Sequence, residues 1–403
     1  MTVQRGNDNM DELHYTLQDG NLVISLVDKI DSANAPRVEA AIRSALREHP
    51  SDSVILDCEK LDYISSAGLR VLLRLKQDVD DTRLVNVSPD LYEIFDMTGF
   101  VEMMDIQKRF RTISVEGCEV IGQGANGKVY RIDSDTVVKS YFDSDALPEI
   151  KRERELARTA FVAGVPTAIP YDVVRIKEGG YGSVFELLNA TSYAKLLIRG
   201  EKTVDEVVEM SVQLLKLIHS RTVKPDALPN MKAVATDWAD FLTDYLSLEL
   251  SQKLSSLIAS VPEDDHILHG DYHIKNVMLQ NGESLLIDMD TLCHGHPIFE
   301  FASIYNAYVG FAVLDHSIQK EFLGISYETS VEFWQKTLQK YFETDDAAFL
   351  QQIEDKAKII GHARIMRRTI RRGGLETENG RAMIEACSSI LAELLPRTDS
   401  LTF

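Results

Sequence analysis

The chain has 403 residues, with 43 Lys and Arg against 63 Asp and Glu, so its formal net charge is −20. Hydrophobic residues at 44% and charged residues at 26% are ordinary for a globular protein and exclude a largely disordered chain. At roughly 150 residues per domain, the length predicts two or three domains. So acidic a composition argues against broad binding to nucleic acid or anionic membranes, although a local cationic site for one nucleotide is still allowed.

The cysteines and the N-terminus favour a soluble, cytoplasmic protein. The four cysteines show no paired spacing, which predicts reduced thiols rather than a disulfide framework or a zinc site. Residues 1–14 have no apolar core and so do not resemble a signal peptide. No apolar run approaches the roughly 20 residues needed to span a bilayer. We therefore expect neither a membrane nor a nucleic-acid partner.

Residues 13–106 alternate short apolar strands with amphipathic helices. This alternation implies crossover connections and parallel strand pairs covered by helices. It predicts an α/β domain over residues 1–110, with a boundary close to residues 108–115. The expected strands and helices, in chain order, are 22–27, 35–47, 54–56, about 69–75, 84–87 and about 91–95.

Within this unit, the segment 61–69 follows a strand and opens a helix. Ser65 and Ser66 therefore lie at a helix N-terminus, where exposed N–H groups favour an anion, although a plain N-cap serine explains the pattern as well. The segment and its surrounding alternation resemble the STAS domain of anti-sigma-factor antagonists. That resemblance implies a phosphorylatable serine at Ser66, with Ser65 at the usual aspartate position, and a protein-binding surface that phosphorylation would disrupt.

From residue 119 the pattern changes to strands joined by tight turns, followed by a mostly helical region. It predicts an α+β unit over residues 115–403, with an N-terminal lobe at about 115–188 and a helical C-terminal lobe at about 189–403. The expected strands are 119–121, 128–132, 137–139, 173–176, 183–186, 277–279 and 285–287, with a helix at about 148–163.

A glycine-rich segment opens the second unit. Residues 122–129 fit G-x-G-x-x-G-x-V. A dinucleotide-binding turn shares this spacing but lies between a strand and a helix, whereas strands are expected on both sides here. Without a Cβ, glycines let backbone N–H groups approach a triphosphate. A plain glycine-rich hairpin is the alternative. The expected nucleotide-binding residues of this segment are Gly122, Gly124, Asn126, Gly127 and Val129.

Lys139 ends the third expected strand of this unit, where a cation can reach nucleotide phosphates. Such a lysine is usually held by a helical carboxylate. Glu153 lies three residues from both Ile150 and Leu156, on the apolar face of the following helix, so we expect it to pair with Lys139. Alternatively, the glutamates of this helix simply face solvent.

The segment 269–276, HGDYHIKN, is the strongest signal in the chain, and a strand, a turn and Asp288 follow it. Asp271 can accept the proton of an attacking hydroxyl, while Asn276 and Asp288 offer hard oxygen ligands to magnesium. Together with Lys139, the residues Asp271 and Asn276 are the expected catalytic set. A metal site built from the nearby histidines is a weaker alternative, since the H-E-x-x-H pattern is absent.

Residues 117–310 resemble the aminoglycoside phosphotransferase and choline-kinase-like branch of the protein-kinase-like fold. That branch carries H-G-D-x-H-x-x-N, as this chain does. The resemblance implies a two-lobed fold, ATP and Mg²⁺ as cofactors, and an adenine-reading hinge near Glu186 and Leu188. The family's G-D-P-x-x-D segment departs here, with His296 and Glu300 at its acidic positions.

The nature of the acceptor follows from what comes after Asp288. No long activation segment and no A-P-E motif follow, so a platform for an extended peptide substrate is not expected. The helical stretches around 203–260 and 330–395 would instead wall a pocket for a small molecule. Asp290 could attract a cationic acceptor there, or could be a solvated turn residue.

Two functional hypotheses result. In the first, the chain is an ATP- and magnesium-dependent phosphotransferase that acts on a hydroxyl of a small molecule and is regulated by the STAS module. In the second, it is a partner-switching regulator whose kinase-like domain senses nucleotide and whose STAS surface binds a protein.

Overall fold

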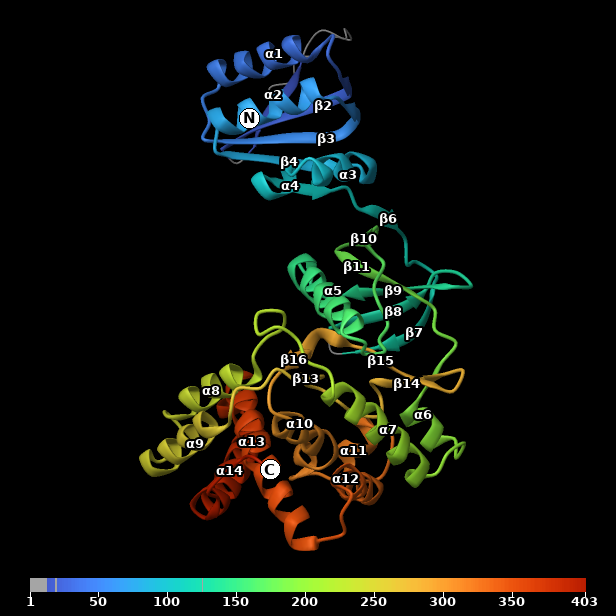
Figure 1. Cartoon of the computed structure of the whole chain (residues 1–403), viewed down its shortest axis with the longest axis vertical. Coiled ribbons are helices and arrows are strands. Elements are labelled where there is room, and N and C mark those ends of the chain that lie inside the picture. Colours follow the sequence, from blue (N-terminus) through green and yellow to red (C-terminus); the bar gives the residue numbers. More distant parts are fainter. Residues whose placement is uncertain (1–12, 19, 125) are drawn as a thin grey trace. The chain divides into compact units, whose positions relative to one another are not determined.

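The computed structural model describes residues 13–18, 20–124 and 126–403 (Figure 1). They divide into one unit that ends at Ile113 and a second over Ser114–Phe403. Each unit has its own hydrophobic core. Within the described part of the chain, no helix is both long enough and apolar enough to cross a membrane.

The first unit is a five-stranded sheet with helices, and its β2-β3 and β3-β4 pairs are parallel, as the alternation predicted. A further strand, β5, was not predicted and pairs parallel to β4. Leu22, Ile24 and Leu26 of β2 are buried at every second position, which is the pattern of a strand with one covered face. The sequence did not predict β1, which pairs antiparallel to β2. The elements are β1 (His14–Gln18), β2 (Asn21–Ile30), α1 (Ala35–Glu48), β3 (Ser53–Ile64), α2 (Ser66–Asp78), β4 (Asp81–Val87), α3 (Pro89–Met97), α4 (Phe100–Met103), β5 (Asp105–Lys108) and β6 (Arg111–Ile113).

The second unit begins with an antiparallel sheet in which five strands lie in the order β10-β11-β9-β8-β7. The predicted meander and its helix are confirmed. The apolar side of α5 is buried, and Glu153 is buried among those apolar residues. The elements are β7 (Glu119–Gln123), β8 (Gly127–Arg131), β9 (Thr136–Tyr141), α5 (Leu147–Val162), β10 (Asp172–Ile176) and β11 (Tyr181–Glu186).

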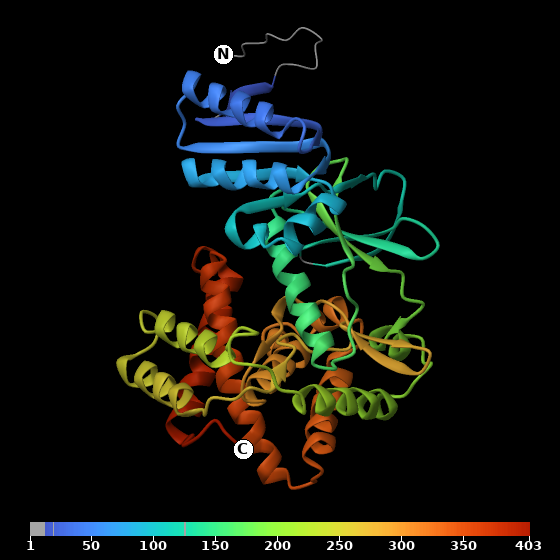
Figure 2. The ribbon, with the colours of Figure 1, turned by 45° about the horizontal axis from the view of Figure 1, so that its top comes forward.

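The rest of the unit is mostly helical, as predicted (Figure 2). Every residue of α10 is buried. The long helix α13 packs against both α10 and α14. The helices are α6 (Tyr193–Ile198), α7 (Val204–His219), α8 (Met231–Leu242), α9 (Leu248–Ser260), α10 (Ile298–Tyr308), α11 (Ser317–Phe322), α12 (Tyr327–Phe342), α13 (Ala347–Arg371) and α14 (Glu378–Leu394). The short helical turns are η1 (Met289–Thr291), η2 (Gly310–Ala312), η3 (Gly374–Glu376) and η4 (Leu395–Arg397).

Short strands frame the segment 269–276. They are β12 (Thr191–Ser192), β13 (Ile267–Leu268), β14 (Val277–Gln280), β15 (Glu283–Leu286) and β16 (Cys293–His294). The β14–β15 hairpin turns at Asn281 and Gly282, whose φ angles are 51° and 86°. A tight two-residue hairpin turn of type I′ requires positive φ angles at both positions. This hairpin returns the chain to Asp288. Gly270 has a φ of 80°, and a Cβ there would lie 2.4 Å from the carbonyl oxygen of Thr291, so the close passage of these two segments requires glycine.

Candidate active site

Lys139 lies at the junction of three elements. Its Nζ is 2.8 Å from Oε1 of Glu153 on α5 and 3.0 Å from Oδ1 of Asp288, the residue before η1. The structure therefore brings Lys139, Glu153 and Asp288 together. Burial lowers the pKa of Lys139, but the charges of Asp288 and Glu153 outweigh burial and raise the pKa above its ordinary value. Lys139 is thus a permanent cation where β9, α5 and η1 meet.

Tyr141, which was not predicted from the sequence, also contacts this ion pair through Glu153. Its hydroxyl donates a hydrogen bond to Oε2 of Glu153 at 2.5 Å and lies 3.3 Å from Oγ of Ser183. Burial raises the pKa of Tyr141, so the hydroxyl remains a donor. Tyr141 is two residues from Lys139 on one strand and therefore shares its face, which is the signal that could have indicated it.

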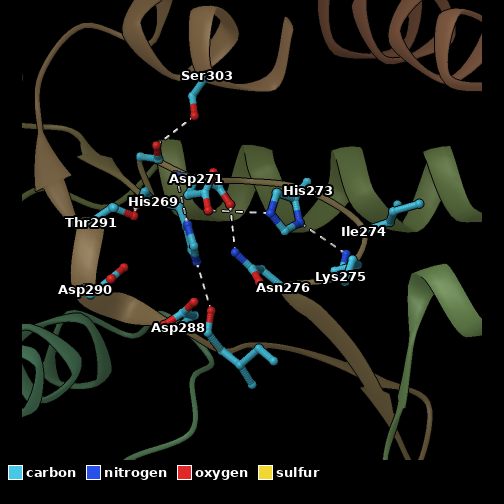
Figure 3. Close-up of polar contacts among 12 residues, drawn as sticks. His269, Asp271, His273, Ile274, Lys275, Asn276, Asp288, Asp290, Thr291 and Ser303 are labelled. Carbon is cyan, nitrogen blue, oxygen red and sulfur yellow. Dashed lines mark hydrogen bonds and ion pairs between the residues drawn. The ribbon is translucent and has the colours of Figure 1, made fainter. Parts of the chain in front are cut away.

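Asp271 lies in the loop between β13 and β14 (Figure 3). Its carboxylate is 3.5 Å from Nε2 of His273, and its backbone N–H donates to Nδ1 of His269 at 3.3 Å. Burial raises the pKa of Asp271, but the hydrogen bond and charge of His273 oppose burial and bring the pKa down to about 2. Asp271 is therefore ionised at neutral pH and can accept a proton.

A buried carboxylate holds the backbone of this loop. Glu300, on α10, is completely buried and accepts hydrogen bonds from the backbone N–H groups of His269 and Gly270. In the sequence, Glu300 stands out only as a departure from a family pattern. Its position in the first turn of α10 now gives it a positioning role, because a carboxylate that accepts backbone N–H bonds fixes the path of the loop.

The carbonyl groups of the loop are held as well. Thr291 donates to the carbonyl of His269 at 2.8 Å, and Ser303 donates to the carbonyl of Gly270 at 2.7 Å. Arg364 of α13 donates to the same Gly270 carbonyl at 3.1 Å. Ser303 and Arg364 were not predicted. Both come from helices far downstream of the loop, so the sequence carried no local signal for them.

Asn276 and Asp288 lie on neighbouring segments beside Asp271 (Figure 3). The Nδ2 of Asn276 donates to the carbonyl of Asp271 at 3.0 Å, which leaves its Oδ1 as the remaining acceptor. Asp288 has a φ of 63°. No cluster of three or more His, Cys, Asp or Glu side chains among the described residues is arranged to hold a metal. Magnesium needs only one or two protein oxygens besides phosphate and water, so an amide oxygen and a carboxylate fit it.

The glycine-rich segment forms the turn between β7 and β8, and Ala125 within it lies outside the described residues. A Cβ on Gly127 would lie 2.2 Å from the carbonyl oxygen of Ser140, whereas none of the described atoms lies within 4 Å of a Cβ built on Gly124. Gly122 pairs across the turn with Val129. The two glycines are therefore required to different degrees. Gly127 is needed for the close packing of β8 on β9, whereas the space that the described atoms leave around Gly124 would admit a side chain.

Asn126, in the same turn, reaches the other lobe. Its Nδ2 donates to Oδ2 of Asp290 at 3.3 Å. Burial, together with the nearby charge of Asp288, raises the pKa of Asp290 to about 7. Asp290 is therefore half-buried and paired with the glycine-rich turn, rather than a solvated turn residue.

The predicted hinge lies where the antiparallel sheet ends. Glu186 is the last residue of β11 and is exposed, and Leu188, two residues on, is half-buried. The backbone N–H of the intervening Leu187 donates to the carbonyl of Asp135 at 2.7 Å. Reading of adenine by this segment stays a prediction.

The first unit carries Ser66 as the first residue of α2, with its side chain exposed. Ser65 is the N-cap, and its Oγ accepts hydrogen bonds from the backbone N–H groups of Ala67 and Gly68 at 3.2 and 3.4 Å. The plain N-cap role therefore belongs to Ser65, which leaves the hydroxyl of Ser66 at the surface.

Comparison with known proteins identifies both units. A family model described as "Phosphotransferase enzyme family" matches residues 117–327, and one described as "STAS domain" matches residues 13–114. A protein described as "Putative anti-sigma factor antagonist BtrV", from Bordetella bronchiseptica, is 36% identical over 92 residues, which are 22% of this chain and 78% of that protein. These matches agree with the α/β first unit and the kinase-like, helix-rich second unit described above.

The solved structures to which the chain is similar include aminoglycoside phosphotransferases. A thermostable mutant of the aminoglycoside phosphotransferase APH(4)-Ia in its apo form is 16% identical, with a TM-score of 0.48, and the match covers 68% of this chain and 94% of that one. A choline/ethanolamine kinase family protein from Mesorhizobium loti is 14% identical, with a TM-score of 0.46, over 69% of this chain and 87% of that one.

Proposed function

We propose that this chain, which belongs to the phosphotransferase enzyme family and carries a STAS domain ahead of it, transfers the γ-phosphoryl group of ATP to a hydroxyl of a small molecule. One observation carries the proposal. Lys139, held by Glu153 on α5, ion-pairs with Asp288, and a loop with an ionised Asp271 lies beside it. This arrangement supports the proposal, because phosphoryl transfer requires a cation for the phosphates and a carboxylate base in one site.

In the proposed reaction Asp271 accepts the proton of the acceptor hydroxyl. The hydroxyl oxygen forms a bond to the γ-phosphorus, the bond between that phosphorus and the β–γ bridging oxygen breaks, and ADP leaves with the electron pair. Lys139 binds phosphate oxygens and offsets their charge. Asn276 and Asp288 would hold magnesium, which would neutralise charge on the transferred group.

A small acceptor is favoured by the short connection after Asp288. Only residues 289–297 separate Asp288 from α10, and they form η1, β16 and the turn into α10. A segment of this length, fixed by those elements, leaves no extended platform on which a peptide could lie. The acceptor therefore reaches Asp271 from the side formed by the helices of the C-terminal lobe.

The test is ADP formation by the full chain with ATP and magnesium, against a panel of amino sugars, choline-like amines, sugars and nucleosides. Asp271→Asn should abolish turnover but leave nucleotide binding largely intact, because Asp271 acts on the acceptor. Asp345→Asn, a change at an exposed position between α12 and α13, is the control and should behave as wild type. Near wild-type turnover by Asp271→Asn would refute the assignment of the base.

A partner-switching function for the first unit is a second proposal, favoured by the exposed Ser66 and by the similarity to BtrV. A phosphate on Ser66 would add roughly two negative charges to this surface. A protein captured by the wild-type chain should then be lost with Ser66→Asp and retained with Ser66→Ala. Equal capture by both variants would exclude a charge switch at Ser66.

Regulation of the phosphotransferase by the STAS domain belongs to the same proposal. Mass spectrometry of the chain after incubation with magnesium and ATP tests whether the second unit modifies the first. Phosphorylation of the Ser66 peptide in the wild type, and its absence in Asp271→Asn, would connect the two units chemically. An unmodified Ser66 peptide in the wild type would exclude self-phosphorylation.

A further inference from the structure

The C-terminal half of α13 carries a row of arginines that the proposed chemistry does not use. They recur at helical spacing, so they share one face of the helix. Among the residues that the structure describes, no carboxylate forms an ion pair with any of them, although the chain has a net charge of −20. This arginine face consists of Arg364, Arg367, Arg368 and Arg371 of α13, together with the C-cap residue Arg372.

The arginine face lies against the loop that carries Asp271. Arg364 donates hydrogen bonds to the carbonyl of Gly270 and to Oγ of Ser303, both at 3.1 Å. Arg368 lies one helical turn further along the same face. The charges of Asp271 and Arg368 act on one another, although burial, and then the like charges of Arg372 and Arg364, lower the pKa of Arg368 overall. Arg364 therefore contacts the loop that carries Asp271, and Arg368 lies next to it on the same face of α13.

Aromatic rings connect the arginine face to the loop that carries Asp271. The guanidinium of Arg368 lies 5.3 Å from the ring centroid of Phe311, and Nζ of Lys275 lies 5.6 Å from that of Phe322. The two phenylalanine rings are 6.4 Å apart, and Phe322 also contacts His273 at 5.0 Å. Cations held on aromatic faces keep their hydrogen-bond donors available, since a ring face accepts none of them strongly.

Helix stability explains only part of this arrangement. Cations in the last turn of α13 are favoured by the helix dipole, which accounts for Arg371 at the helix end and contributes at Arg368. It does not account for Arg364, two turns earlier, or for the buried Nε of Arg367, which has no hydrogen-bond partner among the described residues. Repulsion between neighbouring arginines costs stability unless an anion offsets it.

The acidic side chains near Asp271 are already committed elsewhere. Asp288 pairs with Lys139, and Asp290 accepts a hydrogen bond from Asn126 of the glycine-rich turn. The negative charge of Asp237 acts on Arg367. These contacts therefore do not form an acidic pocket for a cationic acceptor. Attraction of a cation by Asp290 is no longer supported.

We propose that the acceptor is an anion, a small hydroxyl compound whose phosphate or carboxylate group binds to the arginine face while its hydroxyl meets Asp271. This inference rests on the proposed function and adds the chemical class of its acceptor. The planar guanidinium groups of Arg368 and Arg372 suit such an oxyanion because each can donate two parallel hydrogen bonds. Arg364 is a positioning residue, since its donor is used by Gly270 and Ser303.

The test uses the full chain saturated with magnesium and the non-hydrolysable analogue AMP-PNP, which occupies the nucleotide site. Calorimetric titration with inorganic phosphate, glycerol 3-phosphate, glycerate, glycerol and choline compares anionic, neutral and cationic compounds. We expect inorganic phosphate and glycerol 3-phosphate to bind and glycerol and choline not to bind. Glycerate tells whether a carboxylate suffices.

Charge reversal then localises the binding. Arg368→Glu should weaken the binding of inorganic phosphate by about 10- to 100-fold, the value of one or more charged hydrogen bonds. Arg368→Lys should recover part of the affinity. Arg368 is exposed overall, although its guanidinium is partly covered by Phe311, so neither change is expected to unfold the chain. Arg199→Glu, at an exposed position after α6, is the matched control and should bind as wild type.

The two proposals fail in different ways. Unchanged phosphate binding by Arg368→Glu, or absence of phosphate binding in the wild type, overturns the anionic acceptor whatever the enzyme does with ATP. Preferential binding of choline overturns it too. Failure to bind AMP-PNP overturns the proposed function and leaves the phosphate titration readable, since loss of binding in Arg368→Glu still reports on the arginine face.

Discussion

Glu300 shows how one buried side chain can fix a loop. It accepts the backbone N–H groups of both His269 and Gly270. Replacing it by Gln turns one acceptor oxygen into an N–H donor that faces these groups. We expect Glu300→Gln to lower the free energy of unfolding by about 1–3 kcal/mol, the cost of a buried unpaired donor. Urea unfolding measures this loss.

The control for Glu300 is Glu249→Gln, at an exposed position in the first turn of α9, which should change stability little. Turnover provides a second readout. If Glu300 positions the loop, the variant should lower kcat far more than it weakens nucleotide binding. Equal losses in both quantities would mean general unfolding rather than displacement of Asp271.

His362 makes stability depend on pH. It is completely buried on α13, 3.6 Å from Sγ of Cys387 and 3.3 Å from the hydroxyl of Tyr305. Burial lowers its pKa from 6.5 to about 4. The unfolded chain therefore binds a proton more readily than the folded chain between these values, and stability falls as the pH drops through this window.

Between pH 7 and pH 4 we expect the free energy of unfolding of the wild type to fall by roughly 3 kcal/mol more than that of His362→Gln. Urea unfolding at a series of pH values gives the two curves. Other titrating groups contribute to both proteins alike, so the difference isolates His362. Parallel curves would show that the histidine does not control acid sensitivity.

At the scale of elements, the turn between β7 and β8 separates two kinds of glycine. A Cβ on Gly127 meets the carbonyl oxygen of Ser140 at 2.2 Å, but one on Gly124 meets none of the described atoms within 4 Å. Gly127→Ala should therefore push β8 away from β9 and lower the free energy of unfolding by about 1–3 kcal/mol or more. Gly124→Ala should leave the unfolding midpoint nearly unchanged, and thermal unfolding compares the two. Equal destabilisation would contradict this distinction.

The sequence predicted the elements whose signals are local. The apolar face of α5 selected Glu153 from three glutamates, and the structure pairs that residue with Lys139. The β14–β15 hairpin followed from its Asn-Gly turn. Short strands such as β13 and β16 were missed, because two residues carry no periodic pattern.

Some residues of the site were not predicted because they are far from the loop along the chain. Arg364 meets Gly270 across 94 positions, and only the packing of α13 on α10 brings them together. Periodicity shows that α13 has a polar face but not what that face meets. The pairing of Ser303 with Gly270 was hidden for the same reason, although Glu300 lay in a segment already singled out.

At the scale of the whole molecule, each unit should fold without the other. The two cores share no residues. We expect fragments 1–113 and 114–403 each to unfold cooperatively in circular dichroism, at temperatures matching two transitions of the intact chain. A non-cooperative profile for either fragment would show that its core depends on the other unit.

The arginine face of α13 has a further consequence when it is set against the charge of the whole chain. With a net charge of −20, the average field repels any approaching anion. Attraction by the arginines extends only about one Debye length, roughly 8 Å at physiological salt. Added salt should therefore speed the encounter with an anionic acceptor even as it weakens the bound complex. A compact anion can fit within that short range, whereas a long polyanion would remain mostly outside it, so the same charges would admit a metabolite and turn away nucleic acid.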